Sequence, residues 1–466
     1  MQTGLIRTSN RNQSPQGQRT EPLGVSGLVS NLQAGLAAAY VAIAGTYWLP
    51  GIPPSFMAIG KIVVFLTLVL LGASSTVRTD RNNLILYFLL GLCAVFGLIT
   101  GTLTEGVSGG VETFRNFVEP LLWLIALNGM SPRACQKFLA LLKVFLAVGS
   151  VIIFYVILAY FGLVADLETP SELLAGNYRY VGGSTISNSG FTGARTGWGV
   201  VVGPTAIFAA VLLMEGAKRW SARTIFAVVI VGAAVLSTMI TGARGGAFAI
   251  VAAVALGVMS GQRSRYTNLI VVAGLIGMLV YLGAFSIVPD LFFRNLEGSG
   301  SVVERLDVLS TGRISSYVQG IQHWISSPFI GVGPTNALVW VNGGEELPVH
   351  NVWLRVLAES GLFVGVPVFW MTGRWLKLMR DRPVLPGLND STGFLPPSNV
   401  RLVLVCGLVL ALVEPAVLFG SFNSNLAIWT AIWMLMKREA LFESVGSRKI
   451  RATHPQTKGR VLHRPA

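Results

Sequence analysis

Long apolar runs occupy most of this chain, and their lengths decide what it can fold into. A transmembrane helix needs roughly 17 to 25 apolar residues, and runs of about this length recur along the sequence near 27–49, 56–75, 83–100, 113–130, 138–164, 198–215, 223–240, 247–260, 268–288, 352–374, 401–420 and 424–437. Only 12% of the 466 residues are charged, about half of the roughly 25% typical of soluble domains. The sequence therefore predicts an all-α, polytopic integral membrane protein with about twelve transmembrane helices.

The number of spans is less constrained than their order. The eighth and twelfth runs are short, and the fourth contains Arg115 and Glu119. Ten or eleven spans therefore remain open beside twelve.

Basic residues predict the orientation of the spans. Lysine and arginine gather in the N-terminus, the even-numbered connections and the C-terminus, whereas the opposite loops contain no lysine. Because cytoplasmic loops are enriched in these residues, both termini are predicted to be cytoplasmic. The opposite side is called the outer side below. Such scattered charge favours contact with membrane lipids over nucleic acid.

Five segments follow from this topology. A basic cytoplasmic segment, 1–26, precedes transmembrane helices 1–9 in 27–288. A large outer loop, 289–351, leads to helices 10–12 in 352–437, and a basic cytoplasmic tail, 438–466, ends the chain.

The large outer loop is predicted to contain one amphipathic helix. Within Arg313–Ser326 four apolar residues recur at helical spacing and form one stripe, at Ile314, Val318, Ile321 and Ile325. Ser327 and Pro328 end the helix. We expect the helix to lie on the membrane or on the helical bundle.

A six-residue phrase occurs twice, as Thr192-Gly-Ala-Arg-Thr-Gly197 and as Thr241-Gly-Ala-Arg-Gly-Gly246, each just before an apolar run. Arg195 and Arg244 are thereby placed at the outer ends of two helices. A helix N-terminus offers free N–H groups and the positive end of a dipole, and the guanidinium fork binds phosphate in bidentate fashion. The phrase therefore predicts a site for a phosphate-bearing ligand.

His350 precedes the tenth span, with Asn351 as the predicted N-cap. The positive end of the helix disfavours the imidazolium, so a neutral imidazole able to accept a proton is expected. A histidine with only a capping or interfacial role is the alternative. If the sixth, eighth and tenth spans are neighbours, Arg195, Arg244 and His350 meet in one outer pocket that Arg313 can also reach.

Ionisable residues inside spans are costly and mark functional sites by default. Lys61, Arg115 and Glu414 are predicted in the outer halves of their helices, where they are candidates to line the same cavity. Arg355 and Glu359, one turn apart, are expected to form an internal ion pair. No carboxylate cluster has the spacing of a metal site, so metal-independent chemistry without a cofactor is expected.

Three segments together resemble the O-antigen ligase and polymerase superfamily. They are the stretch from Gly312-Arg313 through Ser327-Pro-Phe-Ile-Gly-Val-Gly-Pro334, the segment beginning His350-Asn-Val-Trp-Leu-Arg and ending at Gly365, and Thr241-Gly-Ala-Arg-Gly-Gly246 at the start of a span. The resemblance begins at Thr241 and covers about 170 residues.

The resemblance implies a bacterial inner-membrane glycosyltransferase of the GT-C type with a periplasmic active site. Its donor would be an undecaprenyl-pyrophosphate-linked glycan, and its acceptor a glycan or the lipid A core. His350 would be the general base, and Arg244 and Arg313 would stabilise the pyrophosphate. Arg195 would join Lys61, Arg115, Glu414 and Asn351 in substrate binding.

The branch of the superfamily stays open. Lipopolysaccharide ligase, polymerase, protein glycosylation and exopolysaccharide synthesis all fit the sequence. A transporter or flippase for an anionic or lipid-linked substrate is the alternative from another class. It is disfavoured because transport sites lie near the bilayer midplane, whereas the marked residues lie at the outer edge.

Overall fold

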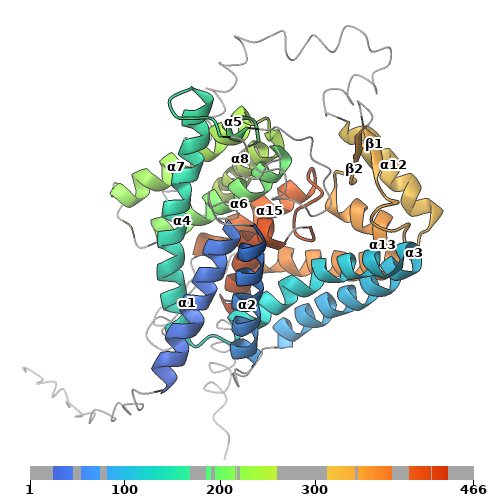
Figure 1. Cartoon of the computed structure of the whole chain (residues 1–466), viewed down its shortest axis with the longest axis horizontal. Helices are drawn as coiled ribbons and strands as arrows, with labels where there is room; N and C mark the ends of the chain where they lie inside the picture. Colours follow the sequence, from blue (N-terminus) through green and yellow to red (C-terminus); the bar gives the residue numbers. More distant parts are fainter. Residues whose placement is uncertain are drawn as a thin grey trace, which may run out of the picture.

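The computed structural model of the chain describes residues 25–45, 54–73, 81–167, 185–189, 195–215, 217, 221–259, 312–341, 345–379, 398–420 and 422–438. Helices dominate these residues (Figure 1). They are α1 (Val25–Gly45), α2 (Pro54–Ala73), α3 (Arg81–Asn128), α4 (Pro132–Tyr160), α5 (Ile186–Ser189), α6 (Arg195–Met214), α7 (Ala222–Ile240), α8 (Arg244–Met259), α12 (Arg313–Ser326), α13 (Val352–Leu378) and α15 (Arg401–Ala411), with a further helix over 426–438. Strands β1 (Val339–Val341) and β2 (Glu345–Leu347) form one antiparallel pair.

The prediction of an all-α membrane protein is confirmed, but the count of twelve spans is not. Among the described residues, five helices are long and apolar enough to cross a membrane, and three shorter apolar helices accompany them. The predicted spans 83–100 and 113–130 both lie within α3, which turns back at Gly106 (φ 76°). The predicted ninth span, 268–288, lies outside the described residues.

The two arms of α3 form a close-packed hairpin because glycines line their contact. A Cβ on Gly101 would lie 2.7 Å from the carbonyl oxygen of Gly109, and one on Gly97 would lie 2.7 Å from the Thr113 methyl group. Small residues allow membrane helices to approach this closely. The hairpin runs beside α13, and α12 with the β1–β2 pair covers one end of both (Figure 1).

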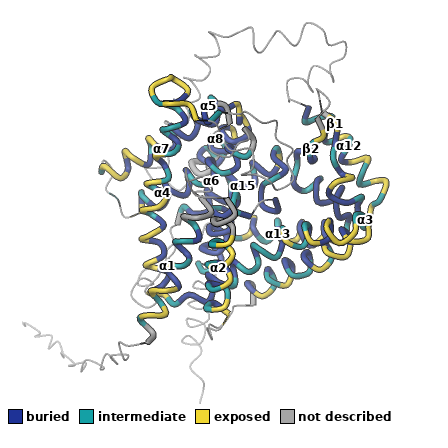
Figure 2. Tube along the Cα trace, in the orientation of Figure 1, coloured by how far each residue is buried: buried dark blue, intermediate teal, exposed yellow. Residues whose placement is uncertain are grey.

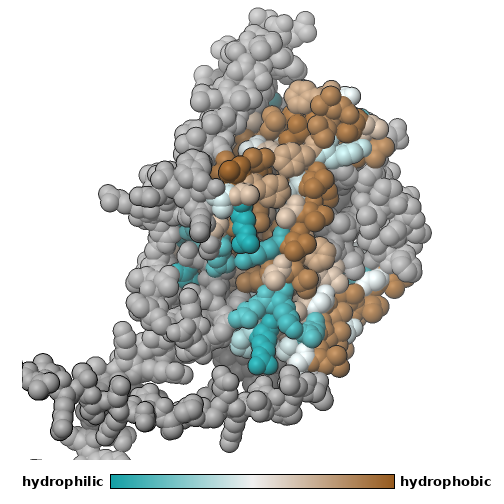
Figure 3. All heavy atoms as spheres, turned by 90° about the vertical axis from the view of Figure 1, so that its left-hand side faces the viewer, coloured by the Kyte–Doolittle hydropathy of each residue, from teal (hydrophilic) through white to brown (hydrophobic). Residues whose placement is uncertain are grey.

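The helices differ in how much of their surface the protein itself covers (Figure 2). In α6, 78% of the apolar window is buried, against 28% in α4. The face formed by α1, α4 and α7 exposes apolar side chains such as Val144, Val148 and Val151 (Figure 3). Because large apolar patches are rare on soluble proteins, this is the kind of surface that faces lipid.

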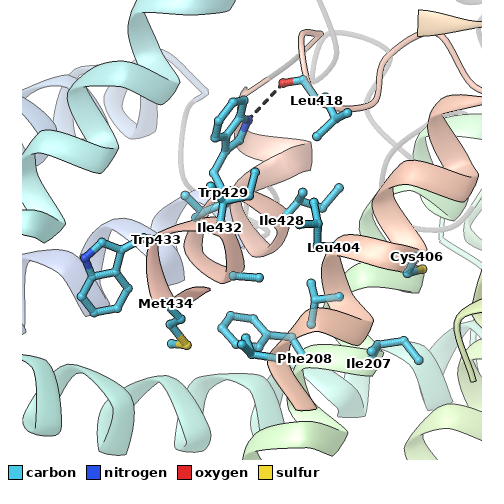
Figure 4. Close-up of a cluster of buried hydrophobic side chains, with 14 of the residues drawn as sticks. Ile207, Phe208, Leu404, Cys406, Leu418, Ile428, Trp429, Ile432, Trp433 and Met434 are labelled. Carbon is cyan, nitrogen blue, oxygen red and sulfur yellow. Dashed lines mark hydrogen bonds between the residues drawn. The ribbon is translucent and has the colours of Figure 1, made fainter. Parts of the chain in front are cut away.

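The core lies where α6, α15 and the last helix meet (Figure 4). Trp429, Trp433 and Phe208 are fully buried there. The indole of Trp429 donates to the Leu418 carbonyl over 3.0 Å (Figure 4). This bond matters because a buried indole N–H without an acceptor costs stability. It also fixes the irregular segment that follows α15.

Contacts between distant segments pair residues that the topology assigns to the same side. On the predicted cytoplasmic side, Ser30 and Ser131 join by a 2.8 Å hydrogen bond. On the predicted outer side, Glu105 at the tip of the α3 hairpin accepts hydrogen bonds from the backbone N–H groups of Thr335 (2.5 Å) and Asn336 (3.0 Å). These contacts agree with the predicted alternation of loops between the two sides of the membrane. Which of the two sides is cytoplasmic stays a prediction.

The amphipathic helix has the predicted bounds, Arg313–Ser326. It packs on the bundle through a face of small residues, since Ser316 and Gly320 are buried and Gly320 faces Val349. Three residues of the apolar stripe, including Val318 and Ile325, are exposed. At 100° per residue, stripe and packed face are about 150° apart. The two predicted placements are thus compatible, because the helix contacts the bundle with one face and leaves its apolar face outward.

Segment 328–333, which follows α12, is hydrogen-bonded to α13 at a break in that helix. At Gly361 the helix leaves the helical conformation (φ 63°, ψ −162°). The carbonyls of Ala358 and Glu359 there accept from the N–H groups of Val332 (2.8 Å) and Gly333 (3.0 Å), whereas the N–H groups of Leu362 and Phe363 donate to the carbonyls of Pro328 (2.9 Å) and Phe329 (3.2 Å). The segment 328–333 thereby completes the backbone hydrogen bonding of the broken helix.

Two glycines make this exchange possible. A Cβ on Gly361 would lie 2.3 Å from the carbonyl carbon of Phe329, and one on Gly331 would lie 2.4 Å from the backbone of Glu359. Both glycines have positive φ, which side chains disfavour. Gly331, in the Gly-x-Gly turn, and Gly361 therefore form the two sides of one close backbone contact, which is called the joint below.

We predict that Gly361→Ala destabilises the protein by about 3 kcal/mol, from strain at positive φ and a steric clash with backbone. Gly373→Ala is the matched control, since Gly373 lies in the same helix and a Cβ added there would meet nothing within 4 Å, and alanine is the better helix former. Thermal unfolding in detergent or nanodiscs measures both. Equal melting temperatures would show that the joint does not stabilise the fold.

Candidate functional site

A buried ion pair joins the amphipathic helix to the segment after α15. The Nη2 atom of Arg313 lies 2.9 Å from Oε1 of Glu414, and the Arg313 side chain retains 20% of its exposure, against 3% for Glu414. Nε of Arg313 also donates to the Val413 carbonyl over 3.2 Å. The guanidinium is thus fixed by two contacts at the first turn of α12 while part of it remains accessible.

Backbone carbonyls at the end of α15 bind side chains from both α12 and the start of α13. The Leu412 carbonyl accepts from the Tyr317 hydroxyl (2.8 Å) and the Asn351 amide (3.3 Å). The Pro415 carbonyl accepts from Nη1 of Arg355 (3.1 Å). These groups require donors because the last carbonyls of a helix have no partner within it. Segment 412–415 is therefore the point where the outer elements meet.

The first turns of α6 and α8 lie side by side at the same place. A Cβ on Gly199 would lie 3.4 Å from Cα of Gly246, and one on Gly245 would lie 2.8 Å from Oε1 of Glu414. The two helices that open at the repeated phrase are thus neighbours, which meets the condition stated above for the sixth and eighth spans. The beginning of α8 contacts the carboxylate that binds Arg313.

His350 lies next to this cluster in a buried position. Its backbone N–H donates to the Ser316 hydroxyl over 2.9 Å. Its Nδ1 atom is buried and has no hydrogen-bond partner within the described part of the chain. Burial, and to a lesser degree the charge of Arg313, lower the pKa of His350 to about 4. This direction agrees with the expected neutral imidazole, but its first cause is burial rather than the end of the helix.

The two predictions for the start of α13 are confirmed. Asn351 is its N-cap and accepts from the Leu354 N–H over 3.0 Å. Arg355 and Glu359 form the internal ion pair, with 2.5 Å between Nε and Oε1. A small cavity beside this pair lies between α3 and α13, lined by residues that include Asn116 and Ser360. Polar groups therefore continue inward from His350 along one side of α13.

Two of the predicted substrate-binding residues belong to another cluster. Arg115 pairs with Glu119 over 3.8 Å, and Lys61 interacts electrostatically with both. None of the contacts described for these residues reaches Arg313 or His350. The prediction that Lys61 and Arg115 line the same cavity as Glu414 thus lacks support from these contacts.

The two arginines of the repeated phrase are placed with different detail. Arg244 is the first residue of α8 and is exposed. Arg195 begins α6, but its side chain lies outside the described residues. Among the residues that the structure describes, no three His, Cys, Asp or Glu side chains are grouped to hold a metal ion.

Sequence reasoning missed three contributors to this site. They are the Ser316 and Tyr317 side chains and the carbonyls of segment 412–415. Ser316 lies opposite the apolar stripe of the predicted amphipathic helix, so the helical pattern indicated its position, whereas Tyr317 lies on the flank of the stripe. No side-chain pattern marks a carbonyl, and only the folded chain shows its use.

Part of the site lies in a segment that matches a known family. Residues 233–369 match the O-antigen ligase family. The matched residues include Arg244, Arg313 and His350, whereas Glu414 lies beyond them. No curated protein is similar enough to the chain to count as a match.

The match supports the coarse function of the chain. Members of the O-antigen ligase family are membrane enzymes that act as glycan ligases or polymerases. The matched residues also include the joint between 328–333 and Gly361. The segment that resembled this superfamily in sequence is thus both the outer part of the fold and the place where its ionisable side chains meet.

We predict that His350 stays neutral down to about pH 4. Because its folded pKa is lowered from 6.5, its contribution to stability is present above pH 6.5 and is lost as the pH falls from 6.5 toward 4. Arg313→Gln should raise the pKa of His350 part of the way to 6.5, since burial remains. Histidine NMR of the micelle-bound protein, assigned with His350→Ala, measures this. Arg374→Gln at the other end of α13 is the control, and an equal shift there would contradict the role of Arg313.

Proposed function

We propose that the chain transfers a glycan from an undecaprenyl-pyrophosphate carrier to an acceptor hydroxyl at the periplasmic face of the bacterial inner membrane. The observation that carries the proposal is the buried position of His350 beside Arg313, within residues that match the O-antigen ligase family. A base and a phosphate-binding cation are the two groups that this transfer needs at one place.

In the proposed reaction His350 takes the proton of the acceptor hydroxyl. The acceptor oxygen forms a bond to the anomeric carbon of the glycan as the bond from that carbon to the pyrophosphate oxygen breaks. The leaving pyrophosphate keeps the electron pair and remains on its lipid. A fixed guanidinium stabilises this growing charge more in the transition state than in the ground state.

The roles of the other residues follow from their positions. Arg313 binds the pyrophosphate, because its side chain lies beside His350 and keeps 20% of its exposure. Arg244 and Arg195 contribute from the adjacent helix starts. Asn351 acts by holding the first turn of α13 and thereby His350. The proposed reaction uses neither a metal nor a cofactor, and the acceptor is a glycan or the lipid A core.

Transport of a lipid-linked anion is the competing function. It requires access to the substrate from both sides of the membrane. The Arg313–Glu414 and Arg355–Glu359 pairs and the buried histidine instead gather toward one end of α13. A base there has no evident use in a flippase, so the enzyme is favoured.

We predict that His350→Ala lowers glycan transfer by about 10²- to 10⁴-fold, the usual contribution of a general base. The measurement is transfer from purified lipid-linked donor to acceptor in proteoliposomes. His323→Ala is the matched control, because His323 lies on α12 outside the cluster. An active His350→Ala protein would refute the role as base.

A second variant tests the phosphate ligand. Arg313→Lys keeps the charge but loses the fork, so we expect a drop of about 10²-fold in the transfer rate, near that for loss of one oxyanion donor. Unchanged kinetics would reduce Arg313 to a packing residue.

The glycans made by a strain that lacks this protein would show which branch of the superfamily it represents. Loss of all long chains from the lipid A core indicates a ligase. Decoration with single repeats indicates a polymerase, and loss of a secreted polymer indicates exopolysaccharide synthesis. Unaltered glycans together with impaired lipid-carrier export would favour the transporter.

A further inference from the structure

The carboxylate of Glu414 occupies a place suited to a phosphate. It contacts the guanidinium of Arg313 at 2.9 Å. It also lies against the first turn of α8, where its Oε1 atom is 2.8 Å from the Cβ position of Gly245. A guanidinium and the N-terminal turn of a helix are the two groups that commonly hold phosphate in proteins.

Only a glycine leaves room for this contact. Any side chain at position 245 would take the space that the carboxylate fills. The cradle is therefore shaped for an anion that approaches the backbone at the start of α8. The Glu414 side chain, carried by the irregular segment after α15, fills it from within the protein.

The contacts of Glu414 are incomplete for a purely structural ion pair. The residue is 2% exposed, yet its Oε2 atom has no hydrogen-bond partner among the described residues. The Nδ1 atom of the nearby His350 is likewise buried without a partner in that part of the chain. Most buried polar atoms in proteins are hydrogen-bonded. Two unpartnered atoms around one guanidinium mark a site whose intended ligand has more polar atoms than Glu414 supplies.

We infer that Glu414 is an internal stand-in for the phosphate of the donor, and that binding of the donor displaces its carboxylate from Arg313 and the first turn of α8. Glu414 thus acts through Arg313. Its carboxylate fills the anion site and neutralises the charge of the guanidinium while no donor is bound. The inference rests on the proposed role of Arg313 as a phosphate ligand.

An internal competitor weakens binding of the external anion. The apparent affinity falls in proportion to the fraction of molecules in which Arg313 is free. Removal of the charge at 414 should therefore tighten binding. A residue needed only to hold Arg313 in place should, when changed, weaken binding instead. The two roles predict opposite signs.

The test is binding of inorganic pyrophosphate to the full-length protein in nanodiscs, measured by titration calorimetry. We expect Glu414→Gln, which keeps the shape but loses the charge, to bind about tenfold more tightly than wild type, as for a freed fraction near one tenth. Arg313→Gln combined with Glu414→Gln should abolish the gain. Unchanged or weaker binding by Glu414→Gln would overturn the inference.

Two further variants separate the inference from other effects. Glu359→Gln removes a carboxylate from the neighbouring buried pair with Arg355, and an equal gain there would show that only the general field has changed. If Glu414→Gln does not fold, Glu414→Asp serves, since one methylene less loosens the contact and should give a smaller gain. The proposed function has its own test: glycan transfer that persists in His350→Ala would contradict it, whatever the pyrophosphate binding of Glu414→Gln.

Discussion

The carbonyl groups at the end of α15 are the constraint on which the outer part of the molecule depends. A helix ends there with unpaired acceptors, and Tyr317, Asn351 and Arg355 supply the donors from two other elements. Glu414 adds a carboxylate beside them and fixes Arg313. Because buried acceptors require partners, the position of this segment determines where the first turns of α12 and α13 lie, and hence where Arg313 and His350 meet.

Burial is the main cause of the lowered pKa of His350. An imidazole at the end of a helix is only weakly biased toward its neutral form, whereas one enclosed by protein and placed beside a guanidinium has its pKa lowered to about 4. The same enclosure makes the Arg313–Glu414 pair dependent on both partners, because loss of one leaves the other charge buried alone. The site is thus sensitive to any ligand that alters the balance of charge around Arg313.

Periodicity and capping chemistry predicted much of this structure. Three features depend only on residues a few positions apart in the sequence: the bounds of α12, the Asn351 cap and the Arg355–Glu359 pair. Such short-range relations do not depend on how the helices pack. The turn of α3 at Gly106 was predicted only as a gap between two spans. The grouping of Lys61 and Arg115 with Glu119 instead of with Glu414 depends on which helices pack together. Hydropathy does not encode that choice, nor does it reveal the use of carbonyl groups as ligands.

The break at Gly361 also orders the folding of the chain. Within a bilayer each backbone polar group without a partner costs several kcal/mol, and four backbone groups of α13 at the break have partners outside the helix. All four are paired by segment 328–333, which is synthesised before α13. The span Val352–Leu378 therefore reaches its lowest free energy only once a segment outside it has docked. In this protein a loop thus pairs backbone groups of a transmembrane helix, which couples the stability of the span to the docking of the segment beside the site.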